Sequence, residues 1–177
     1  VHDGLAEALK YGCIGDPELF ELLENIGSEE DLRNHMEEII LRSVLQKKKF
    51  VEEDRYDNGS RQMLNFGHTI GHAIERYFNY STYTHGEGVA IGMCLLTEQT
   101  ERLGITEKGT ADRVIRPAHH LSLPTSIAVP ALELIPQIMH DKKRRGGEIT
   151  LVVLDKIGKA HLLKVKTSEL DKYIVTE

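Results

Sequence analysis

The sequence predicts a mainly α-helical fold, a single multihelical domain over residues 1–177 with a small β-hairpin near its C-terminal end. Apolar residues recur at helical spacing along most of the chain, and only the stretch 149–165 changes to the alternation typical of strands. Strands and helices do not alternate as a parallel sheet would require. With 177 residues, 40% of them hydrophobic, the chain can bury a core without disulfide bonds.

The first two helices are marked by the residues at their ends. Residues 5–11 are typical of a helix that ends at Gly12. Asp16 and Pro17 form an N-cap and a first-turn proline, so they predict the start of a second helix. We expect this helix to end at Gly27.

The third predicted helix is the longest and begins after Ser28, with Asp31 in the position of a capping box. Its apolar residues keep a helical period over several turns: Leu32, Met36, Ile39, Ile40 and Val44. The pattern runs out at residues 54–57. The turn signal Asn58-Gly59 then precedes another helical stretch from about Arg61.

Shorter elements follow in the second half of the chain. We expect a helix over residues 85–103 that stops at Gly104. Pro117 should end or kink the next helix, because proline has no amide donor. A short helix is expected over residues 132–140.

The hairpin and a last short helix complete the prediction. Residues 149–154 and 161–165 have the pattern of two strands, and Ile157-Gly158 is the turn between them. Ser168 can cap the final helix.

Charge and composition disfavour several kinds of partner and location. Against 28 Asp and Glu, 22 Lys and Arg give a net charge of −6, the wrong sign for general binding to nucleic acid or an anionic membrane. No apolar run approaches the ~18 residues of a membrane span. Cys13 and Cys94 are far apart, which predicts buried free thiols in a reducing compartment, the cytoplasm. The chain begins with Val1 and has no signal region, so we expect it to be part of something longer.

Histidines and glycines are interleaved over residues 65–73. His68 and His72 are four residues apart, so a helix would project both rings from one face, where a metal or an anionic substrate can bridge them. An ordinary polar helix face would have the same spacing. Gly67 and Gly71 indicate that a ligand or another backbone packs close to this turn, and simple helix packing is the alternative.

Two further segments could complete a metal site. His85 lies at an expected helix start, where its side chain can point across a cleft. Glu7 and Lys10 share a helix face, and a carboxylate is a usual third ligand beside two histidines. Taken alone, a Glu–Lys pair at this spacing is typical of a surface salt bridge.

Basic residues near this cluster would suit a small polyanion. Arg61 should fall on roughly the same helix face as the histidine pair and offers a bidentate fork for carboxylate or phosphate. Lys47 ends the long helix, where the helix dipole alone would favour a cation. Lys142 and Lys143 follow a helix in a loop that could cover a pocket. A nucleic-acid patch is disfavoured because no aromatic residues are interleaved.

Four segments carry a family resemblance: residues 4–12, 64–75, 85–93 and 141–143. In order and spacing they closely resemble the C-terminal domain of the 3-dehydroquinate synthase family, whose superfamily also contains other sugar-phosphate cyclases and iron-dependent alcohol dehydrogenases. The resemblance implies a two-domain enzyme, commonly a homodimer, with an N-terminal NAD-binding Rossmann-like half. This chain has no glycine-rich dinucleotide fingerprint, so we expect that half to be absent here and the chain alone to be inactive.

The resemblance also implies roles for single residues. Glu7, His68 and His85 would bind a divalent metal, Zn²⁺ or alternatively Co²⁺, with positions left open for substrate. His72 and Lys10 would be catalytic. The substrate-binding residues would be Lys47, Arg61, Asn65, Lys142 and Lys143.

The implied reaction converts 3-deoxy-D-arabino-heptulosonate 7-phosphate into 3-dehydroquinate and phosphate, in the shikimate pathway of aromatic amino acid biosynthesis. It needs transient oxidation by NAD, so the net reaction is a lyase step without net redox. The alternatives are a cyclase of the 2-deoxy-scyllo-inosose synthase type, an iron-dependent dehydrogenase, and a stand-alone metal-binding module. Asn65 and the triplet 141–143 favour dehydroquinate synthase over the inosose cyclases.

Overall fold

The computed structural model describes residues 2–56, 59–140 and 147–174. Its α-helices are α1 (His2–Ile14), α2 (Pro17–Glu24), α3 (Glu29–Glu53), α4 (His68–Tyr77), α5 (His85–Arg102), α6 (Thr110–His120) and α7 (Ile135–Met139). Its 3₁₀ helices are η1 (Asp54–Tyr56), η2 (Ser60–Asn65), η3 (Ala131–Leu134) and η4 (Thr167–Tyr173). Strands β1 (Glu148–Lys156) and β2 (Lys159–Lys166) pair antiparallel. The predicted helical fold with a hairpin near the C-terminal end is therefore confirmed.

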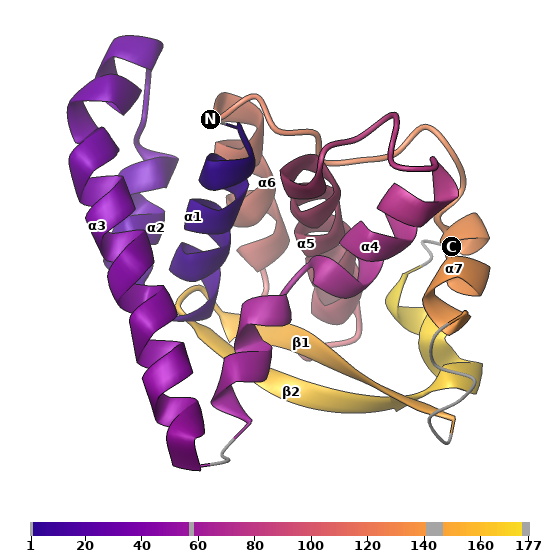
Figure 1. The fold of residues 1–177 in the computed structure, drawn as a ribbon. Coiled ribbons are helices and arrows are strands. Elements are labelled where there is room, and N and C mark those ends of the chain that lie inside the picture. Colours follow the sequence, from indigo (N-terminus) through magenta and orange to yellow (C-terminus); the bar gives the residue numbers. More distant parts are fainter. Residues whose placement is uncertain (1, 57–58, 141–146, 175–177) are drawn as a thin grey trace.

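Helix α5 forms the centre of the helical layer (Figure 1). Helices α1, α4 and α6 pack against it, α2 and α3 lie beyond α1, and the hairpin crosses one end of the helices. Most residues of α5 are buried, from Gly86 to Thr100. A helix that is buried on nearly all sides belongs to the core, so the segment that begins with His85 is held firmly in place.

Side-chain caps start the helices where the sequence predicts them. The Asp16 carboxylate accepts a hydrogen bond from the amide of Leu19 at 3.0 Å, and the Ser28 hydroxyl accepts one from the amide of Asp31 at 3.1 Å. Each bond satisfies an amide that has no partner within its helix, which stabilises the helix by about 1 kcal/mol.

The predicted helix ends at Gly12 and Gly27 are wrong. Helix α1 continues to Ile14, and an added Cβ at Gly12 would lie 3.0 Å from backbone atoms of Phe20. Gly12 therefore lets α2 pack closely against α1. Helix α2 ends earlier than expected, at Glu24, where both the amide and the side chain of Asn25 bond to the carbonyl of Glu21.

A helix end at Pro117 and a cap at Ser168 are also not found. Pro117 lies inside α6, which continues to His120. Because the proline falls in the last two turns, it removes only the bond to the carbonyl of Arg113, and its own carbonyl still accepts from the amide of Leu121 at 2.9 Å. Ser168 is not a cap, because η4 begins at Thr167 without a capping side-chain bond.

Helix α3 is long, as predicted, but its apolar stripe is mostly uncovered. Ile39 and Phe50 are its buried residues, whereas Ile40 is 55% exposed and Val44 58% exposed. Arg42 ties the helix to its neighbour by donating to Glu18 at 2.7 Å and to Asp16 at 3.3 Å.

The hairpin has the predicted strands and turn. Leu151 pairs with Leu163, and Gly158 in the turn has a φ of +84°, a conformation that favours glycine. Ile149, Leu151 and Val153 are buried beneath the helices. The hairpin thereby closes the end of the helical core.

Both cysteines are buried free thiols, as predicted. Burial raises the pKa of Cys94 to about 12 and also raises the pKa of Cys13, so neither thiol is ionised near neutral pH. In the part of the chain that the structure describes, no helix is both long enough and apolar enough to cross a membrane.

Candidate metal centre

Glycines bring α4 and α5 into close contact. An added Cβ at Gly71 would lie 3.0 Å from the backbone of Gly88 and Val89, and one at Gly92 would overlap the carbonyl oxygen of Gly67. Of the two explanations for these interleaved glycines, the structure supports packing against another backbone. The contact places the first residue of α4, His68, near the first residue of α5, His85.

The start of α4 differs from the prediction of one continuous helical face from Arg61 onward. The 3₁₀ helix η2 ends at Asn65, and Gly67 then has a φ of +77° before α4 begins at His68. The chain therefore changes direction between the two segments. Arg61 and Asn65 do not share a helix face with His68.

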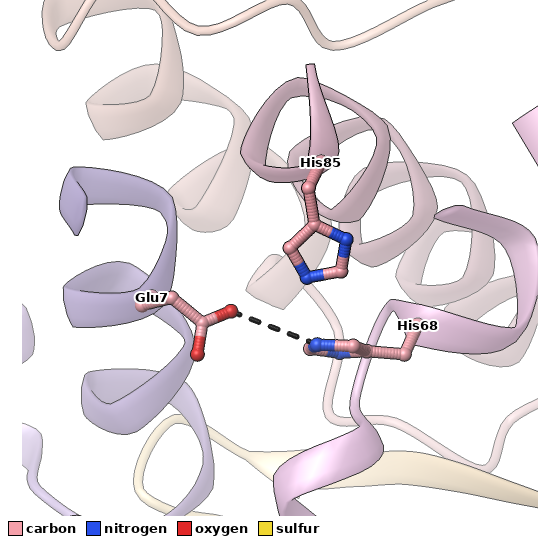
Figure 2. Close-up of side chains that lie close together, drawn as sticks. All are labelled: Glu7, His68 and His85. Atoms are coloured by element: carbon pink, nitrogen blue, oxygen red, sulfur yellow. Dashed lines mark ion pairs between the residues drawn. The ribbon is translucent and has the colours of Figure 1, made fainter. Parts of the chain in front are cut away.

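Glu7 of α1, His68 of α4 and His85 of α5 face one another (Figure 2). One donor atom from each of the three side chains lies within 4.8 Å of the others. The Nε2 atom of His68 is 3.7 Å from Oε1 of Glu7, and the ring centroids of His68 and His85 are 5.1 Å apart. Two imidazoles and one carboxylate in this arrangement fit a divalent metal such as zinc.

The ring of His68 is oriented by the backbone. Its Nδ1 lies 3.1 Å from the carbonyl oxygen of Phe66, which accepts a hydrogen bond when that nitrogen carries the proton. A neutral imidazole has one N–H and one lone pair. The lone pair of Nε2 then faces Glu7, which is the orientation that a metal ligand requires.

The two carboxylate oxygens of Glu7 have different surroundings. Oε2 accepts a hydrogen bond from the Lys10 ammonium at 2.7 Å, whereas Oε1 is buried and has no hydrogen-bond partner. A buried anionic oxygen without a partner is unfavourable. A cation between Glu7 and the two histidines would satisfy it, so the donor set fits a metal.

Burial keeps His68 in the protonation state that metal binding needs. It lowers the pKa of His68 to about 4, and the nearby charge of Lys10 acts in the same direction. Burial also lowers the pKa of Lys10, although the contact with Glu7 opposes this effect. His68 is therefore neutral at pH 7 and able to offer a lone pair.

His72 lies beside the cluster, one turn along α4, as its spacing from His68 predicts. Its ring centroid is 5.6 Å from that of His68 and 5.7 Å from that of His85. Burial is the main cause that lowers its pKa, so His72 is neutral at pH 7 and can accept a proton.

The other predicted site residues do not belong to the cluster of Glu7, His68 and His85. Lys47 is exposed on α3, and its charge contributes to the lowered pKa of Lys10. Arg61 and Asn65 are exposed on η2, which contacts both α1 and α3. Lys142 and Lys143 lie outside the described residues.

Comparisons with known proteins identify relatives of this chain. A family model described as 3-dehydroquinate synthase C-terminal matches residues 4–144. The 3-dehydroquinate synthase of Clostridium acetobutylicum is 45% identical over 175 residues, which cover 98% of this chain and 49% of that protein. This chain belongs to the 3-dehydroquinate synthase family. The Enterococcus faecalis enzyme is 40% identical over 178 residues, so the chain spans about half the length of these relatives.

Solved sugar-phosphate cyclases share the fold of this family member. A 2-epi-5-epi-valiolone synthase from Streptomyces hygroscopicus, with NAD⁺ and Zn²⁺ bound, is 26% identical with a TM-score of 0.81 over 96% of this chain and 49% of its own. A 2-deoxy-scyllo-inosose synthase complexed with carbaglucose-6-phosphate, NAD⁺ and Co²⁺ is 20% identical with a TM-score of 0.76 over 98% and 50%. The second likeness concerns the fold alone.

Sequence reasoning missed two carboxylates that support the site. Glu75 lies 3.3 Å from Nδ1 of His85. Asp3 accepts hydrogen bonds from the Thr84 hydroxyl at 2.5 Å and from the Gly86 amide at 3.1 Å. Their spacing was a usable signal, because Glu75 is seven residues after His68 and Asp3 is four residues before Glu7, on the same helix faces.

We expect Asp3→Ala to weaken the contact between α1 and the start of α5. The change removes the hydrogen bonds from Thr84 and Gly86 to Asp3, and it should lower the free energy of unfolding by about 1 to 2 kcal/mol. Urea unfolding measures this loss, with Asp31→Ala as a control that removes a carboxylate from the first turn of α3 instead. Zinc affinity should fall in the Asp3 variant alone, and equal affinities in the two variants would contradict the role of Asp3.

Proposed function

We propose that this chain is the metal- and substrate-binding half of a 3-dehydroquinate synthase, which converts 3-deoxy-D-arabino-heptulosonate 7-phosphate into 3-dehydroquinate and phosphate. The observation that carries the proposal is the convergence of Glu7, His68 and His85 with their donor atoms within 4.8 Å. The family membership and the 45% identity to a 3-dehydroquinate synthase support it.

The residues of this chain would have different roles at the site. Glu7, His68 and His85 would hold the metal, which when bound polarises a substrate oxygen as a Lewis acid. Lys10 keeps Glu7 in place through the 2.7 Å ion pair. His72, neutral and adjacent to these ligands, is placed to take up or return a proton of the substrate.

Basic side chains would recognise the anionic groups of the substrate. Lys47 and Arg61, both exposed, would bind its carboxylate, and Asn65 would supply an amide. Lys142 or Lys143 would contact the substrate as well. Positive charges suit a reaction whose substrate and departing phosphate are both anions.

The remaining half of the enzyme would bind NAD and close the site. Glu7 and His85 are only partly buried, with side chains 31% and 42% exposed. An N-terminal Rossmann-like half would cover them and bring the nicotinamide to the substrate. We therefore expect the chain alone to be inactive, and the complete enzyme to work as a cytoplasmic homodimer.

Phosphate release by the full-length enzyme tests this function. With heptulosonate 7-phosphate, NAD⁺ and Zn²⁺ we expect stoichiometric phosphate and 3-dehydroquinate without net accumulation of NADH, and no turnover by residues 1–177 alone. Glucose 6-phosphate serves as the competing substrate. Turnover of glucose 6-phosphate, and not of the heptulosonate, would instead assign the chain to a cyclase of the inosose synthase type.

A further inference from the structure

Glu75 lies on α4 in contact with one of the proposed ligands. Its Oε2 is 3.3 Å from Nδ1 of His85 at the start of α5, and its side chain is only 13% exposed. A carboxylate that is this well shielded from water interacts more strongly with a neighbouring N–H than an exposed one does. Nothing in the proposed reaction uses Glu75 directly.

The ring of His85 has two nitrogens that face different groups. Figure 2 shows one ring nitrogen directed toward the space between Glu7 and His68 and the other turned away from it. Because Nδ1 is the atom beside Glu75, Nε2 is the nitrogen that faces the other two side chains. An N–H at Nδ1 donated to Glu75 leaves the lone pair of Nε2 free for a metal.

We propose that Glu75 is a positioning residue that fixes the tautomer and the ring orientation of His85 for metal binding. This inference rests on the proposed metal centre. His68 and His85 would then be oriented in the same way, because the carbonyl oxygen of Phe66 accepts from Nδ1 of His68 as Glu75 would from Nδ1 of His85. Each histidine is then held by a second group on the side away from the metal.

A competing role for Glu75 is direct metal binding. Donor atoms of His72, Glu75 and His85 also lie within 4.8 Å of one another. Two arguments favour positioning. A neutral His85 has a single lone pair, which cannot serve both clusters. The buried Oε1 of Glu7, which has no hydrogen-bond partner, places the need for a cation on the other side of the ring.

Metal titrations of the stripped full-length enzyme separate these roles. Zn²⁺ affinity and stoichiometry are measured by calorimetry, and the visible spectrum of the Co²⁺ form reports on ligand geometry. The variants are Glu75→Ala, which removes the acceptor, and Glu75→Gln, which keeps an acceptor oxygen without the charge. Glu24→Gln is the matched control, because Glu24 is a similarly shielded carboxylate in a remote ion pair with Arg113.

We expect Glu75→Ala to weaken Zn²⁺ binding by about 10- to 100-fold with one site retained, and to shift the Co²⁺ bands. Glu75→Gln should lose only a few-fold, and the control should match the parent. Affinity and Co²⁺ spectrum of Glu75→Ala equal to those of the control would overturn the inference. Complete loss of the site in both Glu75→Ala and Glu75→Gln would also overturn it, because Glu75 would then be a ligand.

The same titrations distinguish this inference from the function on which it rests. A parent enzyme that binds no metal, or a His68→Ala variant that binds it normally, would overturn the proposed metal centre and the role of Glu75 with it. A parent enzyme whose single site depends on His68 but is indifferent to Glu75 would overturn the positioning role alone.

Discussion

His68→Ala in the full-length enzyme is expected to remove tight Zn²⁺ binding and lower turnover by about a thousandfold or more, because the loss of a ligand forfeits several kcal/mol of transition-state stabilisation. The remaining Glu7 and His85 cannot form a three-ligand site. Calorimetric zinc titration and phosphate release measure the two effects.

His35→Ala is the matched control for this variant, since His35 lies on α3 and contacts Asp31 rather than the site. It should bind zinc and turn over like the parent. Retention of one tightly bound zinc by His68→Ala would remove His68 from the ligand set. Glu7→Gln and His85→Ala should then be tested in the same way, because either could belong to a different group of ligands.

The metal-free chain should show a second consequence of the buried His68. In the folded chain its pKa is about 4, against about 6.5 in an unfolded chain, so the folded state binds fewer protons between these values. Stability should therefore fall as the pH drops from about 6.5 to 4, by up to about 3 kcal/mol. His68→Ala should be less sensitive to acid over this window, as urea unfolding at several pH values would measure.

Local signals explain why much of the fold could be predicted from the sequence. Asp16 and Ser28 cap helices through bonds to residues only three positions away, and Gly158 in the hairpin turn has a positive φ that glycine readily adopts. Such features depend on residues that are close together in the sequence.

One error arose where a glycine serves a distant contact instead of a helix end. Gly12 would be a reasonable helix end by itself, but it is where α1 meets Phe20 of α2. Gly67 was predicted inside a helix, and it is the left-handed residue just before one. Sequence alone does not distinguish a glycine needed for its backbone angles from one needed for close packing.

The sequence indicated Glu7 and His85 as groups that could complete the site, and the family resemblance implied that both are ligands together with His68. Spacing alone paired His68 with His72, and only the fold shows that Glu7 and His85 approach His68 from two other helices. The supporting groups were harder to predict, because the bond between Asp3 and the Gly86 amide joins residues 83 positions apart. Such contacts are created by tertiary packing.

Gly92→Ala should be the most destabilising of the changes considered for the fold. The new Cβ would overlap the carbonyl oxygen of Gly67 and lie 3.2 Å from the amide nitrogen of Gly71. Both are backbone atoms that cannot rotate away, so α4 and α5 would have to separate. We expect a loss of about 3 kcal/mol or more in the free energy of unfolding, measured by urea unfolding of the full-length enzyme.

Gly27→Ala is the matched control, because no atom lies within 4 Å of an added Cβ there and its φ is not positive. It should be neutral or stabilising by about 0.5 kcal/mol. Gly92→Ala should also weaken zinc binding, since the separation of α4 from α5 moves His68 away from His85. Equal stability of the two variants would show that these helices can part freely, and the close backbone contact would then not be what holds the two histidines together.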